Sequence, residues 1–129
     1  MRTVGFGHIN LRAPRPLLDR LLAFYTEVVG LESGPRPPFN RFGYWLYCGG
    51  RDIVHLIEAS PEEHRSTDVA TTIDHLAFVC EGFNGFEQRL EQAGIPFQRM
   101  TVLSTGQRQL VVRDPAGNKV ELNFSANET

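Results

Sequence analysis

Polar and apolar residues alternate from Val4 to Arg12, which is the pattern of a strand with one buried face. Ile9 and Leu11 share the predicted buried face. The opposite face carries Phe6, His8, Asn10 and Arg12. Three polar side chains are therefore expected on one face of this strand.

Between Leu17 and Val29, apolar residues recur at spacings of three and four, as an amphipathic helix requires. Gly30 follows at the position of a C-terminal cap. After a proline-rich connection, Phe42–Cys48 and Asp52–Ala59 have strand patterns, and Gly49-Gly50 between them suits a turn with positive φ angles. The two strands are predicted to form a hairpin.

The second half of the chain repeats this order of elements. Ile73–Cys80 is predicted as a strand and Phe83–Ala93 as a helix that ends at Gly94. Three more strands are predicted at Phe97–Leu103, Gln107–Arg113 and Lys119–Phe124, with a turn at Asp114–Gly117. Each half is interpreted as β-α-β-β-β. We expect one α+β domain, residues 1–129, with modules at 1–60 and 72–125 and a connecting loop at 61–71.

Composition fits a single globular domain of 129 residues and gives no sign of a charged macromolecular partner. The formal net charge is −2 and 41% of residues are hydrophobic, so neither nucleic acid nor an anionic membrane is expected as a partner. Cys48 and Cys80 match no C-x-x-C motif and are predicted to be small buried residues. No signal peptide and no long apolar run is seen, so a cytoplasmic location is expected.

Three of the four histidines fall on predicted strands at positions that the repeat relates. His8 and His75 are separated by 67 positions, and His55 and Glu121 by 66. Two related modules that face each other are therefore expected to bring four potential ligands together. Three imidazoles and one carboxylate suit one divalent ion: Zn, Ni, Co, Mn or Fe. His64, in an acidic loop, is predicted to be exposed and without a role.

Four segments resemble the vicinal oxygen chelate superfamily, and together they cover nearly the whole chain: GHINLRA, AFYTEVVGLE, DHLAF and RDPAGNKVELNF. This superfamily includes glyoxalase I, fosfomycin-resistance proteins, extradiol dioxygenases, methylmalonyl-CoA epimerase and bleomycin-resistance proteins. The resemblance implies two βαβββ modules that form a curved eight-stranded mixed sheet around a metal-binding cleft. It also implies a homodimer.

The resemblance assigns roles to the candidate ligands. His8, His75 and Glu121 match the family's ligand positions, and Glu121 is also the candidate catalytic base. His55 stands where glyoxalase I has a glutamate ligand and epimerases have a glutamine. This difference removes one carboxylate from the set of a standard glyoxalase.

Arg12 lies four residues after His8 on the same predicted face, and it resembles the arginine that contacts the glutathione part of the substrate in glyoxalase I. A surface arginine is the alternative interpretation. Arg108 is a candidate for the mouth of the cleft, although an exposed strand edge explains it as well. Trp45 and Tyr47 could form the wall of an apolar pocket or simply pack in the core. The predicted substrate-binding residues are Asn10, Arg12, Trp45, Tyr47, Arg108 and Asn123.

The leading functional hypothesis is a metal-dependent glyoxalase-like lyase or isomerase that acts on a small oxygen-chelating substrate. Such a substrate is an α-hydroxy-carbonyl compound or a thiol conjugate. Three alternatives stay open: an extradiol-type dioxygenase on Fe(II), an antibiotic-modifying thiol transferase, and a non-catalytic ligand-binding protein like the bleomycin-resistance proteins.

Overall fold

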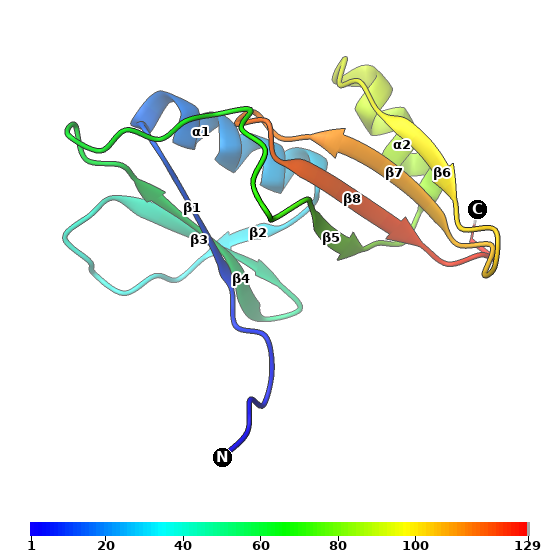
Figure 1. Cartoon of the computed structure of the whole chain (residues 1–129), viewed down its shortest axis with the longest axis horizontal. Coiled ribbons are helices and arrows are strands. Elements are labelled where there is room, and N and C mark those ends of the chain that lie inside the picture. The colour runs from blue at the N-terminus through cyan, green and yellow to red at the C-terminus, as the bar shows by residue number, and fades with distance from the viewer. Residues whose placement is uncertain (129) are drawn as a thin grey trace. The chain divides into compact units, whose positions relative to one another are not determined.

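The computed structural model describes residues 1–128 and divides the chain into two units, Met1–Arg65 and a second that begins at Ser66. Each unit contains a β-α-β-β-β series of elements, and the repeat is visible in Figure 1. The predicted α+β class with two βαβββ modules is confirmed. The eight strands found in residues 1–128 are divided equally between two four-stranded sheets, one in each unit.

The first unit begins its regular structure at Ile9. Its elements are β1 (Ile9–Ala13), α1 (Arg15–Ala23), the π-helical turn η1 (Phe24–Val28), β2 (Glu32–Gly34), β3 (Gly43–Cys48) and β4 (Arg51–Glu58). The strand order is β1-β4-β3-β2, in which β1 is parallel to β4 and the other pairs are antiparallel.

The second unit has the same arrangement. Its elements are β5 (Leu76–Val79), α2 (Phe83–Gln92), β6 (Gln98–Thr101), β7 (Arg108–Arg113) and β8 (Lys119–Phe124). The strand order is β5-β8-β7-β6, and β5 is parallel to β8. In both units the first strand therefore lies beside the last strand along the chain.

One face of each sheet is buried. Successive side chains of a strand point to opposite faces, so the apolar residues that alternate with polar ones all lie on that face. In β4 the buried residues Val54 and Leu56 flank His55, and in β8 Val120 and Leu122 flank Glu121. α2 covers the buried face of its sheet, where the rings of Phe83 and Phe124 meet edge to face at 5.1 Å. The polar residue between each pair of buried ones consequently points to the other face.

Two of the predicted turns are present as expected. Gly49 and Gly50 have φ angles of 56° and 79°, so the hairpin between β3 and β4 uses the positive φ values that glycine allows. In the turn before β8, the buried carboxylate of Asp114 accepts hydrogen bonds from the backbone N–H groups of Ala116 and Asn118, both at 2.9 Å. These contacts fix where β8 begins.

The structure corrects several details of the sequence prediction. β1 begins at Ile9, so Phe6 and His8 precede the strand instead of lying within it. The alternation of polar and apolar residues could not show where β1 begins, because a residue belongs to the strand only if it pairs with a neighbouring strand. The three-residue strand β2 was not predicted, since its residues are polar or glycine. Cys48, predicted to be buried, is exposed because it ends β3 at the hairpin turn, and Cys80 is only partly buried.

His64 is exposed, as predicted. Among residues 1–128, no helix is both long and apolar enough to cross a membrane.

The buried face of β8 gives a stability prediction. Leu122 is fully buried, so Leu122→Ala removes apolar contacts and leaves a cavity, and we expect it to lower the free energy of unfolding by about 2–5 kcal/mol. Leu103→Ala serves as the control because Leu103 is 96% exposed, and it is expected to change this free energy by less than about 0.5 kcal/mol. Urea denaturation measures both. Equal effects of the two substitutions would contradict the assignment of the buried face.

Candidate metal centre

The strand register of the first unit places several predicted site residues on one face. In the parallel pair β1–β4, Asn10 lies beside His55 and Arg12 beside Ile57, and in the antiparallel pair β3–β4, Trp45 lies opposite His55. Neighbouring residues in register share a face of the sheet. His55, Asn10 and Arg12 therefore lie on the face opposite the apolar core, as the alternation predicted, and Trp45, for which core packing was the alternative, lies on the same face as His55.

His55 is held between two rings. The ring of His8 stacks on it with 3.7 Å between centroids, and the indole of Trp45 stacks on it with 4.2 Å between centroids. His55 is consequently only 5% exposed, whereas His8 is exposed. His8 reaches this place because β1 pairs with β4 from Ile9 onward, and because Arg51 at the start of β4 donates a hydrogen bond to the carbonyl of Phe6 at 2.7 Å.

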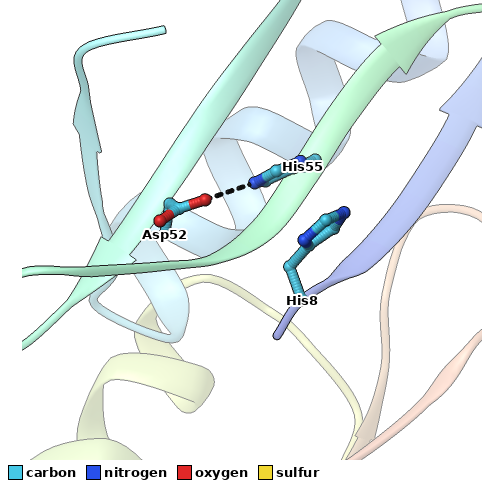
Figure 2. Close-up of side chains that lie close together, drawn as sticks. All are labelled: His8, Asp52 and His55. Carbon is cyan, nitrogen blue, oxygen red and sulfur yellow. Dashed lines mark hydrogen bonds and ion pairs between the residues drawn. The ribbon is translucent and has the colours of Figure 1, made fainter. Parts of the chain in front are cut away.

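Asp52 is the third polar member of this cluster, and the sequence analysis missed it. Figure 2 shows its carboxylate directed at His55, where Oδ2 lies 2.7 Å from Nε2. The hydrogen bond with His55 is the main cause that lowers the pKa of Asp52 below its ordinary value, so the carboxylate is ionised at neutral pH. One candidate ligand atom from each of His8, Asp52 and His55 lies within 4.8 Å of the others.

The second unit brings the other two predicted ligands together. Nε2 of His75, the residue just before β5, lies 3.4 Å from Oε2 of Glu121 in β8. On the opposite edge of the imidazole, Nδ1 of His75 lies 2.8 Å from the carboxylate of Asp74. Lys119 is paired with the same carboxylate at 2.7 Å. These contacts hold the imidazole so that Nε2 is the nitrogen nearest Glu121.

Gln109 in β7 is a second residue that the sequence analysis missed. Its side-chain amide donates to Oε1 of Glu121 at 2.7 Å and to the side-chain oxygen of Asn123 at 2.8 Å. Alternation could have indicated its face, because Leu110 is buried and Gln109 therefore points to the opposite side, but its contact with Glu121 depends on the register of β7 with β8. Gln109 fixes one oxygen of Glu121 and leaves the other toward His75.

The remaining predicted substrate-binding residues have partners within their own units. Arg12 donates to Glu63 at 2.8 Å, and Glu63 also binds Arg65. These two arginines, Arg65 more than Arg12, lower the pKa of Glu63. Arg108 donates to the backbone carbonyl of Glu128 and lies over the ring of Phe83. The hydroxyl of Tyr47 donates to the carbonyl of Pro35.

The two units thus have the same arrangement of potential metal ligands. In each unit a histidine just before the first strand lies beside a potential ligand on the last strand: His8 beside His55, and His75 beside Glu121. The structure brings the four ligands predicted from the sequence together as two pairs. Imidazole nitrogen and carboxylate oxygen are suitable donors for divalent transition metals, and the cluster of His8, Asp52 and His55 is a candidate site for such an ion.

Comparison with known proteins adds to this description. Residues 5–122 match the family model described as the Glyoxalase/Bleomycin resistance protein/Dioxygenase superfamily. A protein of Arabidopsis thaliana called Glyoxylase I 4 is 32% identical over 109 residues, which cover 81% of this chain and 63% of that protein. The chain thus spans less than two thirds of the length of this relative.

Solved structures show the same fold. A glyoxalase family protein from Bacillus anthracis is 26% identical, with a TM-score of 0.71 over 97% of this chain and 99% of that one. A lactoylglutathione lyase from Agrobacterium tumefaciens is 25% identical, with a TM-score of 0.65 over 98% of this chain and 97% of that one. The two-module architecture is therefore shared along nearly the full length of these proteins.

The ion pair of Asp74 and Lys119, beside Nδ1 of His75, allows a prediction for the titration of Asp74. The hydrogen bond from Lys119, with a further contribution from His75, lowers the pKa of Asp74 from 3.8 to about 2. Because the folded pKa lies below the unfolded one, the stabilisation from this pair is present above pH 3.8 and is lost as the pH falls toward 2. Lys119→Met is expected to raise the pKa of Asp74 toward 3.8, as followed by NMR of the carboxyl carbon.

The matched control for this titration is Arg99→Met, which removes the same charge from another ion pair of the second unit, with Glu87 and Glu91. It is expected to leave the titration of Asp74 unchanged. An Asp74 carboxyl that titrates near its ordinary pKa in the unmodified protein would show that Lys119 does not bind it in solution.

Proposed function

Because this chain belongs to the Glyoxalase/Bleomycin resistance protein/Dioxygenase superfamily, we propose that it is a metal-dependent enzyme with a glyoxalase-type lyase or isomerase activity. The observation that carries the proposal is the pairing of potential ligands in each unit, His8 with His55 and His75 with Glu121. We propose these four residues as metal ligands. A non-catalytic binding protein would not require such a set of donors.

The proposed substrate is a small α-hydroxy-carbonyl compound or its thiol conjugate. Two relatives support this class by name, a glyoxylase I and a lactoylglutathione lyase, and the second name describes a hydroxy acid joined to a thiol. In such a compound, a hydroxyl and a carbonyl oxygen lie on adjacent carbons. Isomerisation moves a proton from one of these carbons to the other and passes through an enediolate.

A divalent ion at this site would act as a Lewis acid that stabilises the negative charge on the substrate oxygens. Glu121 is the proposed base, because a carboxylate can accept the proton from the carbon next to the carbonyl and return it to the neighbouring carbon. The amide of Gln109 donates to Oε1 and keeps the carboxylate oriented, while Oε2 faces His75. In the same way, Asp74 orients the imidazole of His75 through its contact with Nδ1.

One observation favours a second candidate, an oxygen-dependent reaction on Fe(II). His8, Asp52 and His55 supply two imidazoles and one carboxylate, which is the donor set that leaves open positions for oxygen on non-haem iron. Purification without oxygen, followed by metal analysis and oxygen uptake with catechols, separates the two candidates. One equivalent of Fe(II) together with catechol-dependent oxygen uptake would favour the oxygenase.

Metal removal tests the metal dependence of the glyoxalase-type candidate. Dialysis against a chelator is expected to abolish turnover of a hemithioacetal made from a 2-oxoaldehyde and a thiol, because the oxyanion then lacks its stabilising charge. Adding back Zn, Ni, Co or Mn one at a time should restore turnover with at least one ion. Full activity of the protein with no bound metal, established by elemental analysis, would refute the proposal.

The role of Glu121 is tested by Glu121→Gln, which preserves shape and removes the basic oxygen. Turnover in the same assay is expected to fall by about 10²–10⁴-fold, the usual contribution of a general base. Metal content is measured in parallel to separate loss of the base from loss of the ion. Glu32→Gln, at an exposed residue of β2, is the control and should retain full turnover. If Glu121→Gln keeps its metal and its full turnover, another residue is the base.

A further inference from the structure

The strand β4 contains an irregularity that changes which side chains share its faces. In the pairing with β3, Leu46 lies opposite Val54, but the next residue, Tyr47, lies opposite Asp52. Ile53 is therefore an extra residue in β4, which is a β-bulge. Strict alternation would put Asp52 and His55, three positions apart, on opposite faces. The bulge restores Asp52 to the face of His55.

The cluster that results has dimensions suited to a shared cation. Ligand atoms lie about 2.0–2.2 Å from an ion such as zinc, so two of them are about 3.0–3.5 Å apart when they bind the same ion. Oδ2 of Asp52 and Nε2 of His55 are 2.7 Å apart, and candidate atoms of all three residues lie within 4.8 Å of one another. Asp52 and His55 are thus already close enough to share an ion, and the third residue, His8, must move to join them.

The two sides of the cluster differ in how firmly they are held. His55 is fixed by the indole of Trp45 on one face and by Asp52 at its edge. His8 is exposed and precedes β1, so its backbone is not held by pairing with β4. The two imidazoles are nearly parallel, at 15°, and nitrogen lone pairs lie in the ring plane, so both rings cannot point at one ion in this arrangement. His8 is the ring that must turn.

The repeat shows that Asp52 is not a general requirement of the fold. Because Ile53 is an extra residue, the separation of 66 positions that relates His55 to Glu121 becomes 67 before the bulge, and Asp52 corresponds to Lys119. Lys119 begins β8 opposite Arg113, and the pairing of β7 with β8 is regular throughout. The bulge and the carboxylate that it redirects belong to the first unit alone. Bulges are frequent beside functional sites for this reason.

We propose that Asp52 is a metal ligand, so that the first unit binds a divalent transition metal through His8, Asp52 and His55. This inference rests on the metal requirement of the proposed function and adds a ligand to the four given there. It also supplies the first unit with a carboxylate donor, as Glu121 supplies the second.

The substitution Asp52→Asn separates a ligand from a residue that only orients His55. The asparagine side-chain oxygen can still accept a hydrogen bond from the N–H group of His55, but a neutral amide is a poor ligand for transition metals. An orienting role therefore survives this change in large part. A ligand role does not.

The experiment measures Zn(II) affinity of the full chain by competition with a chromophoric chelator, and the absorption spectrum of the Co(II) form. Asp52→Asn is expected to weaken Zn(II) binding by more than about 100-fold, beyond the ~10–100-fold typical of a residue outside the ligand shell. It should also alter the Co(II) bands. Glu62→Gln, an exposed carboxylate of the same unit, is the matched control and should bind Zn(II) within about two-fold of the unmodified protein, because exposed charges are screened.

Each result has a distinct meaning. Unchanged Zn(II) affinity and Co(II) spectrum in Asp52→Asn would overturn the ligand role and leave the metal-dependent function standing. An unmodified protein that binds none of the ions would overturn both. If Asp52→Asn does not fold, a crystal structure of the Zn(II)-loaded unmodified protein decides: an Asp52 oxygen about 2.0–2.2 Å from the ion confirms the ligand, and one beyond about 3.5 Å overturns it.

Discussion

The parallel pairing of the first and last strands in each unit is the constraint on which the candidate site depends. β1 lies beside β4 and β5 beside β8, so residues more than 40 positions apart become neighbours. This pairing brings His8 against His55 and His75 against Glu121. A parallel pair needs a long crossover connection, and α1 and α2 belong to the connections in the two units. The helices that cover the sheets thus also allow the ligands to meet.

Burial of one sheet face determines what the other face can hold. Val54, Leu56, Val120 and Leu122 are all buried, which leaves the intervening His55 and Glu121 on the opposite face. A polar side chain there avoids the cost of desolvation in an apolar core. His55 is nevertheless almost completely buried, because the rings of His8 and Trp45 stack on its two faces and the carboxylate of Asp52 lies at its edge.

Both units hold a histidine through an aspartate, but they do so through different nitrogens. Asp52 contacts Nε2 of His55, whereas Asp74 contacts Nδ1 of His75. The choice of nitrogen decides which edge of the ring is available to a ligand. Lys119 joins the second pair and strengthens the ionised state of Asp74, which has a pKa of about 2. The two halves of the repeat have therefore diverged in their electrostatics while keeping their strand order.

The sequence by itself determined the element order, most strand positions and the four candidate ligands. The alternation of apolar residues and the spacing of the repeat depend only on the positions of residues along the chain. The range of β8 agrees with its prediction at both ends, and His55 and Glu121 lie on the polar faces that alternation indicated. Only the tertiary structure revealed Asp52 and Gln109 as neighbours of these ligands. Asp52 depends on a bulge, which is a property of two paired strands, and Gln109 reaches Glu121 across a strand pair. Contacts of this kind arise from register, and register is fixed only when the strands meet.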